Sequence, residues 1–394
     1  MLEGSVHPDF ALVAASLIRQ IPADRHAGSA VCVYHRGVPV VDVWGGLKDV
    51  AGNPWQADTT APSFSTTKGV VSTLLHVLVD QGKAAYDDPI ARYWPEFGSR
   101  GKGQITLRQA LCHEAGLYRI TDLINRPREM LNWLHMKQLI ADADPAHAPG
   151  EAHGYHALTY GWLVGGLVEE IADKPLQQVL HDELVGPLGL DGMFIGLPDG
   201  ELHRRAELTN GVTVRGRPMG DWQETLYEWA ETGLSWLGVE LKEFHSALNP
   251  FNEPFDWNAV DTVQAVIPAA NGQFTARSLA QMYAMLAGGG VLNGVRLLSE
   301  DRVREISQVQ SRSRDRVLFL PMHWRMGYHR AFTLGVSAPH AFGHYGYGGS
   351  GAFCDPTREL AVALTLNSGA GTPMGNSNMP LIARAALRAA DRLR

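Results

Sequence analysis

Hydrophobic and polar positions in the N-terminal part of the chain predict a helix, a β-hairpin and a second, more apolar helix. Apolar residues recur at helical spacing over 9–20, after a proline that favours a helix start. Two β-branched runs within 30–46 flank Arg36-Gly37, a combination typical of an antiparallel hairpin. A loop then leads into an apolar run over 70–78 that ends at Gln81-Gly82, where the glycine favours a helix C-terminus.

The rest of the chain predicts helices first and strands again at the end. Residues 87–190 are mainly helical in pattern, with Pro, Gly and Trp in the connections. An amphipathic helix is predicted over 275–286, where a run of glycines follows it. Two β-rich segments, 351–356 and 360–366, flank a turn, and a helix over 379–394 closes the chain.

The region from 196 to 268 has weak periodicity and four tryptophans, Trp222, Trp229, Trp236 and Trp257. We interpret it as an irregular, partly helical cap that would supply walls to a pocket. A surface excursion packed by its own aromatic residues explains the pattern equally well.

Strands at both ends of the chain, with helices between them, predict an α+β fold. The terminal strands would join in one antiparallel sheet flanked by helices, in a discontinuous lobe made of residues 1–86 and 268–394. Residues 87–267 would form an inserted, mainly helical lobe that carries the irregular cap.

Composition and charge narrow the class of protein. With 394 residues, 45% hydrophobic and 19% charged, the chain can bury a large core and has a soluble globular composition. A net charge of −7 argues against nucleic acid or an anionic membrane surface as a partner. No apolar stretch approaches the length that spans a bilayer. The N-terminus lacks the basic and apolar regions of a signal peptide, so we expect a cytoplasmic location.

Cysteine and histidine usage gives no reason for a metal or a cofactor. Cys32, Cys112 and Cys354 are odd in number and widely separated, so we expect them to be reduced and packed in the interior. The sixteen histidines form no His-Glu-x-x-His or comparable cluster. We therefore infer neither a metal nor a cofactor.

The strongest chemical signal is Ser65-Thr66-Thr67-Lys68, at the start of the predicted apolar helix. Residues three apart share a helix face, so the Lys68 amine can reach the Ser65 hydroxyl. A serine is a poor nucleophile until a neighbour takes its proton. Backbone N–H groups at a helix N-terminus also favour negative charge that develops there. The structural alternative is a helix N-cap at Ser65 and an ordinary first-turn residue at Lys68.

The same spacing occurs again at Ser99-Arg100-Gly101-Lys102. This copy lies between Gly98 and Gly103, and no apolar run follows it. We therefore interpret it as a solvated turn.

Two further segments carry candidate chemistry. Tyr155 lies in a loop before a helix rich in small residues; beside a lysine ammonium, its phenol would be held as phenolate and would take the Ser65 proton. Taken alone, Tyr155 fits a packed aromatic residue better. The glycine-dense stretch 342–351, which contains His344, would bring a backbone N–H close to a substrate. Taken alone, it fits a tight glycine hairpin with a buried histidine better.

The order of these elements resembles the class C β-lactamase-like superfamily and, within it, the family VIII carboxylesterases. Ser-x-x-Lys, a tyrosine loop about ninety residues further on, and His344-Tyr345-Gly346 follow one another as in that superfamily. Three segments are especially similar to those esterases: Tyr155-His156-Ala157-Leu158-Thr159-Tyr160-Gly161-Trp162-Leu163, Ile105-Thr106-Leu107-Arg108-Gln109-Ala110-Leu111-Cys112-His113-Glu114-Ala115-Gly116-Leu117 and Pro268-Ala269-Ala270-Asn271-Gly272. The resemblance covers nearly the full chain.

The resemblance implies roles for the site residues. Ser65 would be the acylated nucleophile, Lys68 its proton partner and Tyr155 the base. The oxyanion and substrate-binding set would be Ser65, His344, Gly346 and Tyr347, with the Tyr347 N–H as the second oxyanion donor beside that of Ser65.

Two positions depart from the β-lactamase pattern. Ala157 stands where those enzymes have an asparagine, and His344, largely neutral near pH 7, stands where they have a lysine. Losing one charge-assisted hydrogen bond costs roughly 1.5–3 kcal/mol, so these changes favour uncharged esters over anionic lactams. The chain has no Gly-x-Ser-x-Gly pentapeptide, so an α/β-hydrolase nucleophile elbow finds no support.

We therefore expect a cytoplasmic serine carboxylesterase that hydrolyses small uncharged esters through an acyl-enzyme. Its partner would be a small-molecule ester, with no nucleic acid and no membrane, and a homo-oligomer is left open. The alternatives on the same fold are a β-lactamase or D-amino-acid peptidase, an acyltransferase, and a non-catalytic binding protein.

Overall fold

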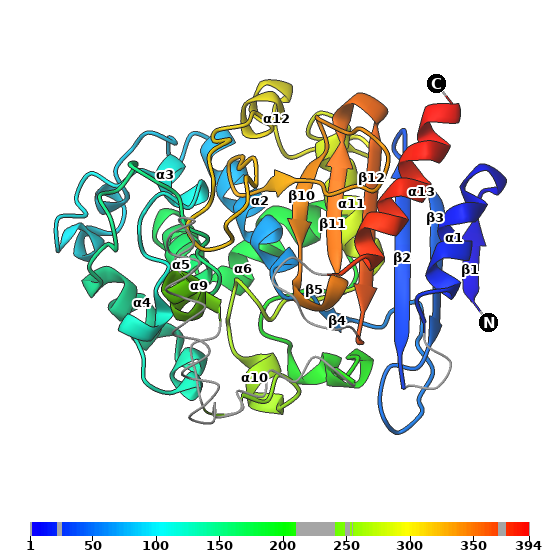
Figure 1. Ribbon diagram of the computed structural model, residues 1–394, viewed down its shortest axis with the longest axis horizontal. Helices are drawn as coiled ribbons and strands as arrows, with labels where there is room; N and C mark the ends of the chain where they lie inside the picture. Colours follow the sequence, from blue (N-terminus) through cyan, green and yellow to red (C-terminus); the bar gives the residue numbers. More distant parts are fainter. Residues whose placement is uncertain are drawn as a thin grey trace.

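An antiparallel sheet of seven strands forms one side of the protein (Figure 1). The computed structural model describes residues 2–21, 26–209, 241–248, 253, 255–368 and 376–393. The strands lie in the order β1 (Glu3–Val6), β3 (Val38–Gly46), β2 (Gly28–His35), β12 (Leu360–Leu366), β11 (Gly351–Asp355), β10 (Phe342–Tyr345) and β9 (His329–Arg330). The first and last parts of the chain therefore share one sheet, as the sequence predicts.

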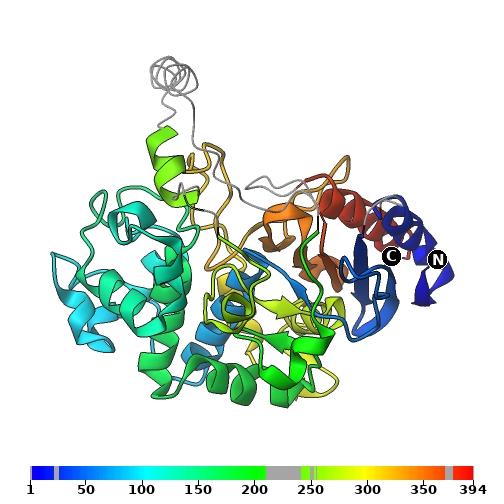
Figure 2. The ribbon, with the colours of Figure 1, turned by 90° about the horizontal axis from the view of Figure 1, so that it is seen from below.

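The two faces of this sheet bury different residues, because successive side chains of a strand point to opposite sides. On β2, Val31 and Val33 belong to the core beneath α1 (Ala11–Ile18) and α13 (Asn378–Arg392). Cys32 and Tyr34 belong to the core on the other face, where α11 (Ala276–Ala287) packs. Helices thus cover both faces (Figure 2), which confirms the predicted α+β fold class.

The predicted elements of the sheet side agree with those observed. The hairpin of β2 and β3 turns at Arg36 and Gly37, which have φ values of 53° and 76°. A left-handed backbone at both positions suits the two-residue turns that connect twisted strands. The helix predicted over 9–20 is a short 3-10 helix, Pro8–Phe10, that continues into α1.

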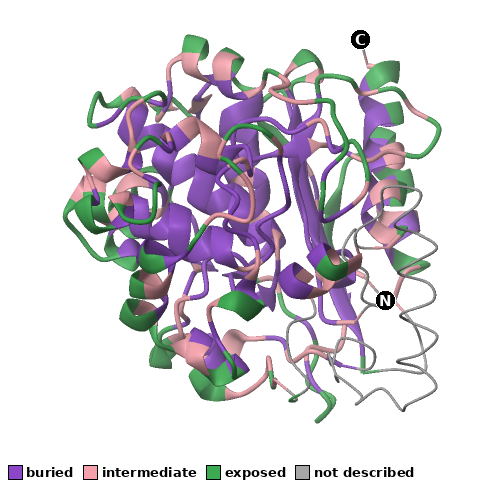
Figure 3. Ribbon diagram, turned by 60° about the vertical axis from the view of Figure 1, so that its left-hand side comes forward, coloured by how far each residue is buried: buried purple, intermediate pink, exposed green. Residues whose placement is uncertain are grey.

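The other side of the protein is mainly helical and is built around α2 (Thr66–Asp80). Every residue of α2 before Asp80 is buried, and the helix packs against both α5 (Thr159–Ala172) and β10. Figure 3 shows this buried centre between the sheet and the outer helices. Among the described residues, no helix is long and apolar enough to cross a membrane.

Shorter elements complete the fold. The helices are α3 (Leu107–Leu111), α4 (Trp133–Asp142), α6 (Leu176–Leu180), α7 (Gly186–Leu188), α9 (Leu241–Leu248), α10 (Val260–Gln264) and α12 (Glu300–Ile306). The short strands are β4 (Ala61–Pro62), β5 (Met193–Phe194), β6 (Gln273–Phe274), β7 (Val291–Leu292) and β8 (Val295–Arg296).

One hydrophobic core runs from the sheet side into the helical side. It includes Ala363 from β12, Leu74 from α2 and Leu163 from α5. Because this core is continuous, it does not mark a boundary between lobes. The division into 1–86 with 268–394 and 87–267 stays a prediction.

The three cysteines lie in the interior, as predicted. Cys32, Cys112 and Cys354 are free thiols with at most 1% of their surface exposed. Burial raises the pKa of each thiol, so all three stay protonated and unreactive at neutral pH.

Residues 210–240, 249–252 and 254 of the predicted cap lie outside the described residues, and with them Trp222, Trp229 and Trp236. Trp257 is described, and its ring centroid lies 5.5 Å from that of Phe64, the residue before Ser65. The interpretation of the whole region as a pocket wall stays a prediction.

The second Ser-x-x-Lys copy is a turn, but the prediction that it is solvated is wrong for its lysine. Lys102 is fully buried, and its Nζ donates a 2.6 Å hydrogen bond to the carbonyl oxygen of Ala143. Ser99 Oγ donates to the carbonyl oxygen of Ala141, 2.7 Å away. Both side chains therefore satisfy carbonyls at the C-terminus of α4, where cations and donors are favoured.

Candidate active site

Ser65 is presented by a bend immediately before α2. Phe64 has a φ of 43°, a left-handed conformation that is rare for a bulky residue and turns the chain into the helix. The Phe64 ring is held by Trp257 and Tyr347, with centroids 5.5 and 5.6 Å away. Ser65 occupies the N-cap position of α2, but its side chain makes no capping hydrogen bond to the helix.

Lys68 lies one turn into α2 and is fully buried. Its Nζ is 3.0 Å from Ser65 Oγ, 2.6 Å from the carbonyl oxygen of Ala157 and 3.0 Å from that of Ala269. Burial holds the pKa of Lys68 well below its usual range. In the neutral amine, the two carbonyl oxygens accept both N–H groups, and the lone pair is left for the Ser65 hydroxyl.

Tyr155 completes the contact with Ser65 from the loop before α5. Its hydroxyl is 2.7 Å from Ser65 Oγ, and its ring centroid is 4.9 Å from Lys68 Nζ. Only 3% of the surface of Tyr155 is exposed. Burial raises the pKa of Tyr155 above its usual value, against the lowering effect of the Ser65 hydrogen bond. The expected phenolate beside a lysine ammonium is therefore corrected: burial disfavours the charged form of both groups.

Gly346 brings the glycine-dense strand end against the bend at Ser65. A Cβ on Gly346 would lie 2.5 Å from the carbonyl oxygen of Ser63 and 3.1 Å from Thr66 Oγ1, so only glycine fits here. Tyr347 follows, packed on Phe64. Neither the Ser65 N–H nor the Tyr347 N–H donates a hydrogen bond to a described residue.

His344 lies on β10 and is 2% exposed. Its Nδ1 is 3.1 Å from the carbonyl oxygen of Tyr345, so Nδ1 carries the hydrogen and Nε2 is left as an acceptor. Nε2 has no partner among the described residues. Burial, followed by the neighbouring His329 and Lys68, lowers the pKa of His344 well below its usual range, which agrees with the expected neutral imidazole.

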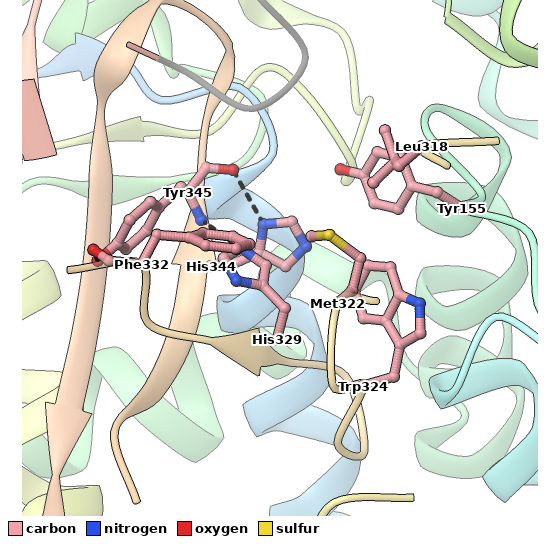
Figure 4. Close-up of a pocket in the computed structure, with 8 residues that line it drawn as sticks. All are labelled: Tyr155, Leu318, Met322, Trp324, His329, Phe332, His344 and Tyr345. Carbon is pink, nitrogen blue, oxygen red and sulfur yellow. Dashed lines mark hydrogen bonds between the residues drawn. The ribbon is translucent and has the colours of Figure 1, made fainter. Parts of the chain in front are cut away.

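A narrow pocket opens beside these groups (Figure 4). It is lined by Tyr155, Leu318, Met322, Trp324, His329, Phe332, His344 and Tyr345. The inner space is about the size of one water molecule. Mostly apolar and aromatic walls around few polar atoms are typical of a site for an uncharged group.

The structure adds residues that the sequence analysis missed. The Ala269 carbonyl, which accepts a hydrogen bond from Lys68, belongs to the segment 268–272 that resembles the esterases. His113, in the similar segment 105–117, accepts a hydrogen bond from the His156 N–H and so supports the tyrosine loop. Asp315 and Trp324 touch Tyr155 from a segment in which no motif stood out.

A serine, a buried lysine and a tyrosine in mutual contact on this fold define a serine hydrolase of the β-lactamase type. The model of the Beta-lactamase family matches residues 14–387, and the chain therefore belongs to this family.

Similar proteins carry both esterase and β-lactamase names. The chain is 35% identical to Esterase/beta-lactamase LipL of Mycobacterium tuberculosis, over 92% of this chain and 82% of that protein. The crystal structure of a family VIII carboxylesterase superposes with a TM-score of 0.85 at 28% identity, covering 99% and 100% of the two chains. A penicillin-binding protein homologue from Caulobacter crescentus gives a TM-score of 0.84 at 31% identity, covering 99% and 100%. The chain is thus an esterase/β-lactamase-like hydrolase, and its resemblance to family VIII carboxylesterases is confirmed.

Proposed function

We propose that this protein is a serine carboxylesterase that hydrolyses small uncharged esters through an acyl-enzyme. The observation that carries the proposal is the contact of Ser65 Oγ with two proton-handling groups, Lys68 Nζ at 3.0 Å and the Tyr155 hydroxyl at 2.7 Å. Such a cluster activates a serine that is otherwise a weak nucleophile.

Lys68, as a neutral amine, takes the Ser65 proton in the first step. Its lowered pKa favours the neutral amine, and the carbonyls of Ala157 and Ala269 hold its N–H groups away from Ser65. Ser65 Oγ then attacks the ester carbonyl carbon. The N–H groups of Ser65 and Tyr347 receive the oxyanion at the start of α2.

Tyr155, as a neutral phenol, gives its proton to the leaving alkoxide when the tetrahedral intermediate collapses. The Lys68 ammonium returns a proton to Tyr155, so both groups are neutral again in the acyl-enzyme. Water then attacks the acyl group and loses its proton to Lys68, and the Ser65 oxygen leaves with a proton from Tyr155. The raised pKa of Tyr155 and the lowered pKa of Lys68 support this order of transfers.

Tyr155→Phe tests the role of the phenol. We expect kcat for a short alkyl ester, followed by release of the acid, to fall at least about a hundredfold, because its alkoxide leaving group needs a proton and the donor is lost while the stacked ring is kept. Tyr160→Phe is the matched control: Tyr160 is also fully buried, with its hydroxyl 2.7 Å from Ser72 Oγ. If Tyr155→Phe loses no more kcat than Tyr160→Phe, the leaving group takes its proton elsewhere.

A β-lactamase is the second candidate, because the relative LipL carries both names. The neutral His344 favours the esterase: a fixed cation that would pair with a lactam carboxylate is replaced by a hydrogen-bond acceptor. We expect kcat/KM for a chromogenic cephalosporin to be lower than for a short p-nitrophenyl ester.

His344→Lys should raise the cephalosporin-to-ester ratio of kcat/KM by about tenfold, as one charge-assisted contact is added. His340→Lys adds the same charge at an exposed residue and should leave the ratio unchanged. A ratio that stays constant in folded His344→Lys would show that pocket shape, and not charge, sets the preference.

A further inference from the structure

Asp315 is a fully buried carboxylate to which the proposed reaction assigns no step. Its Oδ1 accepts hydrogen bonds from the N–H groups of Tyr155 at 3.1 Å, Val317 at 2.8 Å and Leu318 at 2.9 Å. Its Oδ2 accepts from the indole N–H of Trp324 at 3.0 Å. Two of these donors are local to its own turn, whereas the other two join separate segments of the chain.

Trp324 in turn holds the ring of Tyr155. The two rings are stacked, with centroids 5.6 Å apart and planes inclined by 12°. Trp324 is fully buried, and His113 packs on it with a centroid distance of 4.3 Å. Figure 4 shows Tyr155 and Trp324 together on one side of the pocket, across from His344. The indole N–H bond to Asp315 therefore fixes the surface against which the phenol lies.

The two segments are also tied through their backbones. The Arg316 N–H donates to the carbonyl oxygen of His153 at 3.0 Å, and His153 Nε2 lies 3.1 Å from the carbonyl oxygen of Ser313. The loop that carries Asp315 thus runs along the residues that lead to Tyr155. Asp315 accepts a hydrogen bond from the backbone N–H of Tyr155, and Trp324 stacks on the Tyr155 ring.

We propose that Asp315, acting with Trp324, is the positioning residue that aims the Tyr155 hydroxyl at Ser65 Oγ; this inference rests on the proposed catalytic role of Tyr155. Active-site groups must be held to within fractions of an ångström, and side chains locked by packing and outer hydrogen bonds provide this. The negative charge of Asp315 also contributes to the raised pKa of Tyr155, after burial, and so favours the protonated phenol.

Asp315→Asn tests this in a double-mutant cycle with Tyr155→Phe. Asparagine keeps the volume of the aspartate side chain but replaces one carboxylate oxygen with an NH2 group. This NH2 group would face an N–H donor that the lost oxygen accepted from. In the wild-type background we expect kcat to fall about ten- to a hundredfold with KM within about twofold. In the Tyr155→Phe background, Asp315→Asn should change kcat by less than about twofold, because a residue that acts through the phenol has nothing left to position.

Two measurements and a matched control variant keep the test decisive. Active sites are counted by labelling with a fluorophosphonate, so kcat is expressed per reactive Ser65, and Tm reports stability. Asp355→Asn is the matched control: Asp355 is also fully buried and accepts from the Thr357 N–H and from Arg358. It should lower Tm without changing kcat per site. If Asp315→Asn does not fold, Trp324→Phe enters the same cycle, because it keeps a stacked ring and removes one donor to Asp315; we expect about a three- to tenfold loss of kcat that again vanishes in the Tyr155→Phe background.

The outcomes separate this inference from the proposed function. Equal fold-losses of kcat in both backgrounds would mean that Asp315 supports the fold in general, which overturns the positioning role alone. Unchanged kcat in Asp315→Asn would overturn it as well. Near-wild-type kcat in Tyr155→Phe itself would overturn both the positioning role and the proposed catalytic role of Tyr155.

Discussion

Ser65→Ala should abolish ester hydrolysis and leave the protein folded. The nucleophilic oxygen is lost, whereas the helix start loses little, since Ser65 makes no capping hydrogen bond. Even a full N-cap contributes only about 0.5–2 kcal/mol. The measurement is kcat per mole of folded protein with a short p-nitrophenyl ester, together with loss of fluorophosphonate labelling.

Ser99→Ala is the matched control for this experiment, because it removes the serine of the second Ser-x-x-Lys copy. Its hydroxyl donates to the Ala141 carbonyl, so the variant should lose about 1 kcal/mol of stability and keep its activity. Comparable activity losses in both serine variants would point to a folding defect. More than about 1% residual turnover in pure Ser65→Ala would show that another group is the nucleophile.

Local contacts were predictable from the sequence, because they depend on one element at a time. The hairpin at Arg36-Gly37 and the approach of Lys68 to Ser65 follow from turn chemistry and helix geometry. The contact between Tyr155 and Ser65 joins residues 90 positions apart. No periodicity brings them together, and the expectation depended on the resemblance to known esterases.

Protonation states were not predictable, because they depend on what the fold removes from water. Lys68 and Tyr155 are close, and in water a lysine ammonium lowers the pKa of a nearby phenol. In the structure both are buried, so desolvation disfavours the ammonium and the phenolate alike. Burial by a distant segment also explains the wrong prediction for Lys102. Its glycine-flanked turn has the sequence of a solvated turn, but the end of α4 covers it in the folded protein.

Asp315 was missed for a related reason. Its segment shows no strong periodicity, and a single acidic residue among arginines gives no catalytic signal. Its function as an acceptor is defined by a backbone donor 160 residues away, at Tyr155. Buried polar groups require partners, but the sequence does not say which ones the fold supplies.

Lys68→Met should lower kcat by about a thousandfold or more. Methionine is unbranched and neutral, so it can occupy the buried slot, but it has no lone pair placed to take the Ser65 proton. Loss of general base catalysis removes about a hundred- to ten-thousandfold, and here the same group serves both half-reactions. We expect KM to change much less than kcat, since the amine contacts Ser65 and two backbone carbonyls.

Lys102→Met is the matched control, because this lysine is equally buried and donates to one carbonyl, that of Ala143. It should lose stability and keep kcat per folded molecule. A similar fall in kcat in both lysine variants would mean that Lys68 supports the fold, as Lys102 does, and is not the general base.

The pH dependence gives the sharpest test of Lys68 as the base. The active form is the unprotonated amine, so kcat/KM of the wild type should rise with pH through the pKa of Lys68, and this limb should lie well below the ordinary lysine value because the pKa is lowered. At pH values between the lowered pKa of Lys68 in the folded protein and its ordinary pKa in the unfolded chain, only the unfolded chain holds a proton on Lys68. The free energy of unfolding that Lys68 contributes therefore rises with pH in this range. The kinetic limb should disappear in Lys68→Met and persist in Lys102→Met. Burial also lowers the pKa of Lys102, so each variant should lose its own share of the stability slope, and the kinetic limb is what distinguishes them. An unchanged acid limb in Lys68→Met would assign the proton acceptor to a different group.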